Sequence, residues 1–165
     1  MARQWHRHAA MTGKSVVAVR GTGMRRADRP EDLLRLDRLG TGALVIGSDG
    51  RMLWCIGPER FWLKRDGCEI VTYTAIGGKA EVGESLQSAT LRELREESGC
   101  EASLLPALST VVHDLDTGVW EYCEITGMPN PAVLYSSGRT GFSVAAYWAR
   151  LEGTPKPSME IPALL

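Results

Sequence analysis

The feature that most constrains this chain is a short helix predicted over residues 85–98, because strong start and stop signals bound it. Ser85 is a residue type whose side chain accepts a hydrogen bond from the first helical turn. Gly99 stands where a helix commonly ends in the left-handed conformation. The length and register of this helix are therefore fixed, and the side chains that it carries have defined relative positions.

Three glutamates crowd this predicted helix. Glu93, Glu96 and Glu97 are three or four residues apart or adjacent, so their carboxylates gather on one side. At a separation of about 6 Å two carboxylates repel by roughly 0.7 kcal/mol in water, but by about 3 kcal/mol at an effective dielectric near 20. Leu86 and Ala89 project on the same side, which indicates partial enclosure. A divalent cation would relieve the repulsion, and carboxylate oxygens suit Mg²⁺.

The spacing of the surrounding residues decides how this charged stretch is interpreted. A run of Arg and Glu is more often a solvated helix face than a site. Here, however, the chain fits the pattern G-x5-E-x7-R-E-U-x-E-E-x-G-U, where U is a bulky aliphatic residue, at Gly78, Glu84, Arg92, Glu93, Glu96, Glu97 and Gly99. This segment resembles the signature of the Nudix hydrolase family. Seven such matches would arise by chance with a probability of about one in a million. Cys100 departs from the last aliphatic position.

The resemblance implies both a fold and a metal site. The expected fold class is α/β, a Nudix-type α/β/α sandwich with a mixed curved β-sheet and the signature segment as a loop-helix-loop. Glu93, Glu96 and Glu97 are expected to bind Mg²⁺ or Mn²⁺, and the backbone carbonyl of Gly78 is expected to add a ligand. By the same resemblance, Glu84 steadies the loop and Gly99 permits the turn after the helix.

The chemistry implied is hydrolysis of a diphosphate linkage in a small nucleotide-like substrate. The predicted catalytic residues are Glu93, Glu97 and Arg92, with either glutamate as general base and Arg92 orienting its neighbours. An acidic residue outside the signature is the alternative base, with Asp114, Glu121 and Glu124 as candidates. His113 is a weaker candidate for proton transfer.

Two other functions stay open. The first is a catalytically inactive Nudix-like module that senses a nucleotide. The second is an isomerase of related fold acting on an isoprenoid diphosphate, which would need a reactive cysteine such as Cys55 or Cys68.

Substrate contacts are less sharply predicted. Lys79, Trp62 and Arg139 are the chosen candidates, Lys79 because it lies inside the signature loop. Strand-associated aromatic residues fill cores more often than they stack on bases; those considered are Trp54, Phe61, Trp62, Tyr73, Trp120 and Tyr122. Residues 115–119 lack the marker Pro or Tyr of some Nudix subfamilies, so no subfamily is assigned.

Length and composition predict a single domain. The 165 residues are 44% hydrophobic, which suits one core, and we expect a partly ordered extension over residues 1–30, with an edge strand at 15–20, before a domain at 31–165. The net charge of -1 argues against nucleic acid or membrane partners. Four cysteines without a C-x-x-C pair favour reduced thiols and a cytoplasmic location.

The remaining elements follow from local patterns. Pro30 begins a predicted helix over residues 31–39, followed by a hairpin over 43–46 and 52–56. Further strands are predicted at 61–63, 70–74, 111–112, 120–125 and 142–151. Residues 153–165 contain three prolines and no helical period, so we expect them to cross the surface or add an edge strand. The tail then supplies no helix for the second face of the sheet. We expect that face to be covered by the helix at 31–39 or by a partner, such as a second copy in a homodimer, or to stay uncovered.

Overall fold

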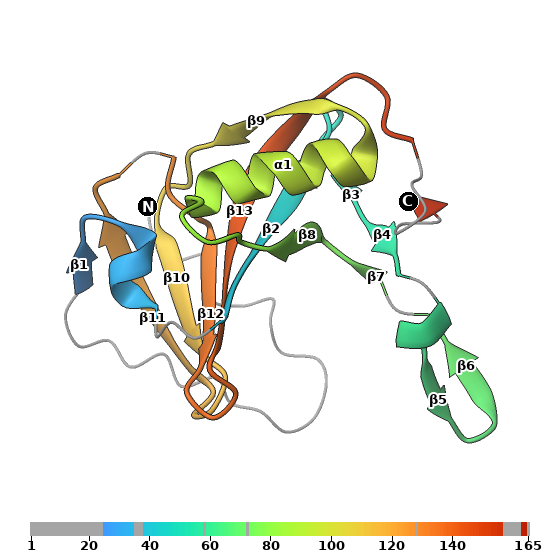
Figure 1. Cartoon of the computed structure of the whole chain (residues 1–165), viewed down its shortest axis with the longest axis horizontal. Helices are drawn as coiled ribbons and strands as arrows, with labels where there is room; N and C mark the ends of the chain where they lie inside the picture. Colours follow the sequence, from blue (N-terminus) through green and yellow to red (C-terminus); the bar gives the residue numbers. More distant parts are fainter. Residues whose placement is uncertain are drawn as a thin grey trace, which may run out of the picture.

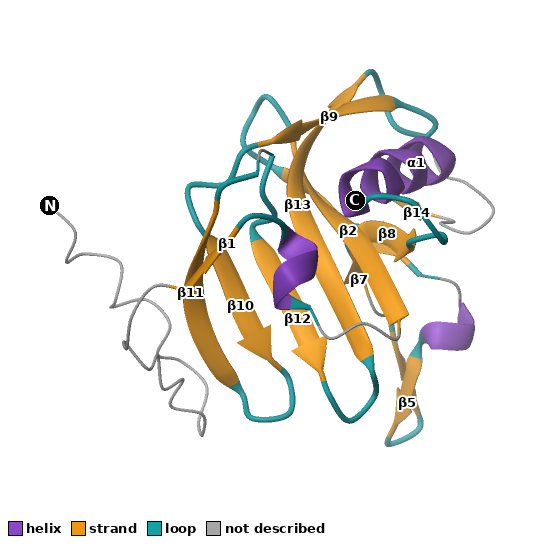
Figure 2. Cartoon of the chain, turned by 60° about the vertical axis from the view of Figure 1, so that its left-hand side comes forward, coloured by secondary structure: helices purple, strands orange, loops and turns teal. Residues whose placement is uncertain are grey.

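A nine-stranded mixed sheet with one α-helix across it forms the body of the molecule (Figures 1 and 2). The structure is a computed structural model that describes residues 25–34, 38–57, 59–71, 73–127, 129–156 and 163–164. The sheet has the order β1-β11-β10-β12-β13-β2-β3, with β8 paired to β2 and β9 to β13. Its strands are β1 (Arg25–Ala27), β2 (Arg38–Ile46), β3 (Met52–Leu53), β8 (Ile76–Lys79), β9 (Glu101–Leu105), β10 (Thr110–Asp114), β11 (Val119–Ile125), β12 (Val133–Ser137) and β13 (Phe142–Glu152).

The centre of the sheet is the long parallel pair of β2 and β13. Their register runs from Arg38 opposite Phe142 to Val45 opposite Ala149. Two small side chains of β13, Ala145 and Ala149, are completely buried. Side chains of this size let a helix pack closely, and successive residues of β2 alternate between the two faces of the sheet.

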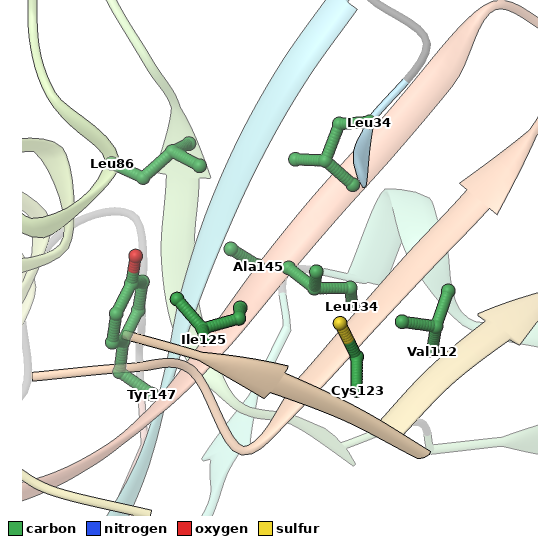
Figure 3. Close-up of a cluster of buried hydrophobic side chains, with 8 residues drawn as sticks. All are labelled: Leu34, Leu86, Val112, Cys123, Ile125, Leu134, Ala145 and Tyr147. Atoms are coloured by element: carbon green, nitrogen blue, oxygen red, sulfur yellow. The ribbon is translucent and has the colours of Figure 1, made fainter. Parts of the chain in front are cut away.

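The helix α1 (Leu86–Ser98) lies against one face of this sheet. Ser85 caps its N-terminus by accepting a hydrogen bond from the Ser88 N–H, and Gly99 ends it with a φ of 70°. Leu86 packs in a cluster with β-strand residues and with Leu34, which follows the 3-10 turn η2 (Pro30–Leu33). The cluster, shown in Figure 3, consists of Leu34, Leu86, Val112, Cys123, Ile125, Leu134, Ala145 and Tyr147.

Two smaller sheets lie beside the body. One joins β14 (Ala163–Leu164), β4 (Cys55–Ile56) and β7 (Tyr73–Thr74). The other is the hairpin of β5 (Leu63–Arg65) and β6 (Cys68–Ile70), which follows the 3-10 turn η3 (Glu59–Phe61) and projects from the molecule in Figure 1. Asp66 and Gly67 at its tip both have positive φ, at 52° and 76°. A two-residue turn of this kind favours Asp-Gly.

The predicted α/β class, the helix at 85–98 and the hairpin after residue 43 are confirmed. The helix predicted over 31–39 is wrong: only a 3-10 turn forms at Pro30–Leu33, and Leu39 lies in β2 opposite Ser143. The strand predicted at 61–63 is displaced, because Glu59–Phe61 is a 3-10 turn and β5 begins at Leu63. β9 and β12 were not predicted.

The expectations for the two ends of the chain can be compared with the structure only in part, because only some residues of each end are described. β1 lies within the predicted N-terminal extension and pairs with β11, while the strand predicted at 15–20 lies outside the described residues. β14 provides the predicted edge strand at the other end. In the described ranges α1 is the sole α-helix, so the second helical layer of the expected sandwich is not found there. Those ranges hold no helix with the length and apolarity needed to cross a membrane.

Candidate active site

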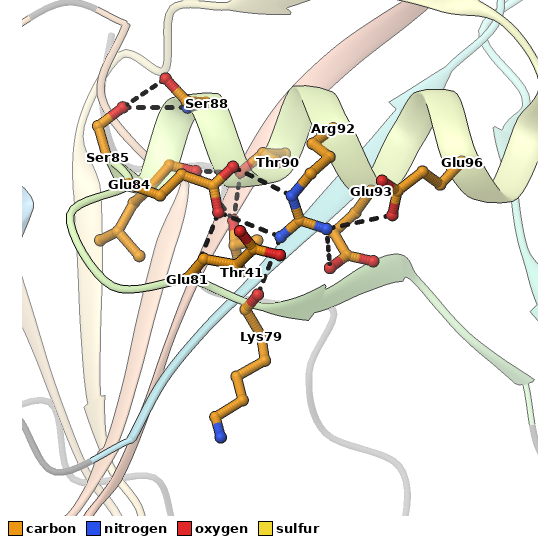
Figure 4. A network of polar contacts seen from close by, with 11 residues as sticks. Thr41, Lys79, Glu81, Glu84, Ser85, Ser88, Thr90, Arg92, Glu93 and Glu96 are labelled. Atoms are coloured by element: carbon orange, nitrogen blue, oxygen red, sulfur yellow. Dashed lines mark hydrogen bonds and ion pairs between the residues drawn. The ribbon is translucent and has the colours of Figure 1, made fainter.

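Arg92 is the centre of a dense polar network along α1 (Figure 4). Its Nε and Nη2 donate to the two carboxylate oxygens of Glu84, each at 3.1 Å. Its Nη1 donates to Glu93 Oε1 at 2.8 Å and to Glu96 Oε2 at 3.1 Å. Its Nη2 also reaches the backbone carbonyl of Lys79 at 3.0 Å. One guanidinium therefore ties the signature loop to the acidic face of the helix, as the predicted orienting role requires.

These contacts determine the charge states of Glu84 and Arg92. Arg92, hydrogen-bonded to Glu84, holds the pKa of that carboxyl below its usual range, and the Glu81 N–H that Glu84 accepts at 3.0 Å acts in the same direction. Glu84, with Glu93 beside it, in turn raises the pKa of Arg92. The network therefore keeps Glu84 ionised and Arg92 charged.

Glu97 lies deepest of the three glutamates, with 8% of its surface exposed. Its Oε2 accepts a hydrogen bond of 3.1 Å from the Gly77 N–H. Burial, and to a smaller extent the nearby Glu97 carboxylate, raise the pKa of the Cys55 thiol to about 12. Cys55 is therefore a neutral packing residue at physiological pH, and Cys68 is exposed on β6, so neither suits the isomerase alternative.

The strand β8 carries two glycines because α1 and β2 approach it closely. A Cβ on Gly78 would overlap the carboxylate of Glu93, and one on Gly77 would overlap the backbone of Thr41. Thr41 itself is buried and its hydroxyl hydrogen-bonds to that of Thr90 on α1. These contacts hold the acidic face of the helix directly against the two central residues of β8, which have no side chains.

The backbone direction along β8 changes one predicted ligand. Ala80 N–H donates to the Leu39 carbonyl of β2, whereas the Gly77 N–H and the Lys79 carbonyl bond to side chains of α1. Alternate residues of an antiparallel strand direct both backbone groups to the same side. The carbonyl of Gly78 therefore faces β2, and the carbonyl of Gly77 faces the glutamates, contrary to the prediction.

The acidic residues of α1 and the neighbouring backbone carbonyl offer ligands that suit a hard cation. Glu93 and Glu97 are 12% and 8% exposed, and together with Glu96 and the Gly77 carbonyl they offer only oxygen atoms. Arg92 Nη1 holds Glu93 and Glu96 and the Gly77 N–H holds Glu97, and no group of three acidic, His or Cys side chains in the described part of the chain is gathered for metal binding. Glu96 is 54% exposed and can change rotamer without disturbing the core.

A cavity of about 920 Å³ lies on the other side of β8. Gly77, Gly78 and Lys79 line it, so the strand that touches the acidic residues also forms a wall of this space. We call it the sheet cavity; its other lining residues are Arg38, Leu39, Gly40, Thr41, Gly42, Leu44, Trp54, Tyr73, Thr74, Ala75, Tyr135, Phe142, Val144 and Ala146. Its volume is typical of a small-molecule site.

The predicted substrate contacts are separated by the fold. Lys79 lines the sheet cavity, and its side chain extends away from α1 (Figure 4). Trp62 and Arg139 do not line it: Trp62 Nε1 donates to the Gly57 carbonyl at 2.8 Å, and Arg139 is 81% exposed in the turn after β12. Of the predicted aromatic residues, Trp54 and Tyr73 line it.

The alternative bases lie on β10 and β11 and do not line the sheet cavity. Asp114 accepts the N–H groups of Asp116 and Thr117 in a turn. Glu124 pairs with Arg26 of β1, and Glu121 is on the same strand. His113 stacks on Trp120 with ring centroids 3.7 Å apart, and its buried Nδ1 has no hydrogen-bond partner.

Sequence reasoning missed Arg38 and Tyr135 as candidate site residues. Both line the sheet cavity, Arg38 from β2 and Tyr135 from β12. One available signal was the pair Gly40 and Gly42 in an apolar segment, because glycine inside a strand often marks the close approach of a ligand or of another backbone.

The family follows from comparison with known proteins. The model of the NUDIX domain matches residues 36–160, and the chain therefore belongs to the Nudix hydrolase family. A search of curated proteins finds no match.

The first of three similar solved structures shows that the fold is shared. A NUDIX-family hydrolase from Clostridium perfringens superposes with a TM-score of 0.53 at 17% identity, over 78% of each chain. An ADP-ribose pyrophosphatase from Streptococcus suis gives 0.47 at 18% identity, over 78% of this chain and 71% of that one. A NUDIX hydrolase from Nitrosomonas europaea gives 0.49 at 14% identity, over 79% of this chain and 56% of that one.

Proposed function

We propose that this chain is a divalent-metal-dependent hydrolase that cleaves a diphosphate linkage in a nucleoside diphosphate joined to another moiety, or in a nucleoside triphosphate. The observation that carries the proposal is the position of β8. Glu93 and Glu97 contact one side of this strand, and the sheet cavity opens on the other. A diphosphate placed along the glycines of β8 would lie next to both.

Glu93, Glu96 and Glu97, with the carbonyl of Gly77, would hold Mg²⁺ or Mn²⁺. When bound, such an ion makes a water more acidic and neutralises charge on the phosphate oxygens. Because Glu93 and Glu97 are mostly buried and point toward β8, we assign one of them as the general base. It takes the proton of the water that attacks one phosphorus, the bond from that phosphorus to the bridging oxygen breaks, and the other phosphate group leaves with that oxygen and with the moiety attached to it.

Two cationic side chains support this reaction in different ways. Arg92 touches Glu84, Glu93 and Glu96 and is a positioning residue. Lys79 belongs to β8 but extends its ammonium group toward the sheet cavity, where it would attract the phosphates.

A nucleotide-sensing module is the second candidate function. The observation in its favour is that hydrogen bonds within the chain already engage all three carboxylates, Glu93 and Glu96 with Arg92 and Glu97 with the Gly77 N–H. A sensor would bind nucleotides in the sheet cavity and release no phosphate.

The test is release of the cleavage products, two phosphate monoesters or a nucleotide with phosphate or pyrophosphate, resolved by chromatography, from nucleoside triphosphates, nucleotide sugars, ADP-ribose, dinucleotides and coenzyme A, with Mg²⁺ or Mn²⁺ and with a chelator. We expect metal-dependent release from at least one of them, and a loss of turnover of about 10²- to 10⁴-fold in Glu97→Gln. Glu101→Gln is the matched control, because it makes the same chemical change on an exposed position of β9. Unchanged turnover in Glu97→Gln would rule out the assigned role, and no release from any compound would favour the sensor.

A further inference from the structure

The sheet cavity lies on the face of β2 that points away from α1. Thr41 points toward α1 and hydrogen-bonds to the Leu86 carbonyl and Thr90 there. Its neighbours Gly40 and Gly42 therefore face the opposite side, because side chains alternate along a strand. In cross-strand register Gly40 lies opposite both Val144 and Lys79, and Val144 lies opposite Tyr135. Gly40 and Gly42 thus form a part of the cavity wall without side chains, which we call its floor. The Lys79 ammonium group lies on one side of it and the Tyr135 ring on the other.

Cationic side chains line only one end of this floor. The charged side chains that line it, Arg38 and Lys79, are both cationic and lie at the end where β2 begins. Aromatic rings line both ends: Phe142, opposite Arg38, and Tyr135 lie at the cationic end, whereas Trp54 and Tyr73 lie with Leu44 toward the other end, which has no charged side chain among the described lining residues. Leu44 follows Arg38 by six positions on β2, or about 20 Å of strand at roughly 3.3 Å per residue. A ligand with phosphates at one end and a planar apolar group at the other fits this arrangement.

The aromatic end offers ring surfaces, and the hydrogen-bonding side-chain groups beside them are the hydroxyls of Tyr73 and Thr74 and the indole N–H of Trp54. The rings of Trp54 and Tyr73 have centroids 6.2 Å apart and are tilted by 58°. None of the described lining residues is Asp, Glu, Asn, Gln or His. Strong discrimination between similar ligands needs buried groups that hydrogen-bond to one of them, whereas stacking on an aromatic ring accepts every base.

We propose, on the basis of the hydrolase function above, that the sheet cavity binds the nucleoside of the substrate. The phosphates lie at Lys79 and Arg38, and the base stacks at Trp54 and Tyr73. The substrates are therefore diphosphate derivatives of purine and pyrimidine nucleosides alike, selected for an aromatic base but not for its identity.

The test is calorimetric binding of ADP, GDP, CDP, UDP and inorganic pyrophosphate without divalent metal, so that the readout does not depend on hydrolysis. We expect the four nucleotides to bind with Kd values within about tenfold of one another, because stacking accepts any base. We expect pyrophosphate, which has no base to stack, to bind at least about tenfold more weakly.

Three variants locate the base. Tyr73→Leu should raise the nucleotide Kd values by about tenfold and leave that of pyrophosphate unchanged. The matched control is Tyr122→Leu, because Tyr122 is also an exposed strand tyrosine, at 53% against 64% for Tyr73, but does not line the cavity. Gly42→Leu should weaken all four nucleotides, since a Cβ there has only the Ile76 carbonyl near it, at 3.5 Å, and the added side chain projects into the cavity.

A preference of more than about 100-fold for one base would overturn the proposal. So would nucleotide binding that Gly42→Leu leaves unchanged, an equal response of Tyr73→Leu and Tyr122→Leu, or no binding of any of the four. Binding as expected without metal-dependent hydrolysis would refute the hydrolase function and leave this inference standing. Hydrolysis that none of the cavity variants alters would refute the inference alone.

Discussion

Replacing Gly78 by alanine tests the close packing of β8 against α1. An added Cβ would lie 2.5 Å from Glu93 Oε2, whereas ordinary contact begins at 3.4 Å, so the carboxylate must move by about 1 Å. It would then lose its 2.8 Å hydrogen bond from Arg92 Nη1. Overpacking of this kind costs about 1–3 kcal/mol. Gly78 has an ordinary φ, so alanine also recovers about 0.4–1 kcal/mol by restricting the unfolded chain.

We therefore expect the free energy of unfolding to fall by about 1–2 kcal/mol and Tm by roughly 2–8 °C. Urea denaturation followed by circular dichroism measures the first, and a thermal melt the second. The control is a double-mutant cycle with Glu93→Ala, which removes the group that the new methyl overlaps. In that background Gly78→Ala should be neutral or slightly stabilising. If alanine costs the same in both backgrounds, or stabilises the wild-type chain, the packing argument is incorrect.

Two further predictions concern single ionisable groups. Because Arg92 lowers the pKa of Glu84 in the folded state, the resulting stability is present above the usual value of 4.5 and is lost as pH falls through the lower folded value. Urea midpoints from pH 7 to pH 3 should thus fall more steeply in the wild type than in Glu84→Gln, and parallel curves would contradict the pairing. The exposed Cys68 should be the cysteine that reacts with a thiol reagent at pH 8 in the native protein, while Cys55, Cys100 and Cys123 react after denaturation; rapid labelling of Cys55, detected by mass spectrometry, would show that its burial is wrong.

The arrangement of the glutamates on α1 was predictable from sequence because it depends on local spacing. Ser85, Gly99 and the positions between them define one helix, and a helix places Glu93 next to Glu97 whatever the rest of the chain does. The exception was the direction of the Gly78 carbonyl, which faces β2 and not the glutamates. Its direction depends on the register of β8 with β2, which no pattern within the loop determines.

The cavity half was not predictable because its residues come together only through strand pairing. Arg38 comes from a segment where leucines at helical spacing predicted a helix, but pairing of β2 with β13 overrides that preference. Tyr135 comes from β12, which follows Pro131 and ends in two serines that resemble a loop. Trp62 and Arg139 were chosen by residue type alone, and the fold places them outside the cavity.

The two glycines of β8 have a consequence for how such a protein can change over time. Residues that would perform hydrolysis and residues that would select the substrate lie on opposite sides of β8, whose two central residues have no side chain. A substitution at Tyr73, Tyr135 or Leu44 can therefore reshape ligand preference while leaving the reaction machinery intact. New specificities can arise on this scaffold one side chain at a time, without a compensating change on the helix.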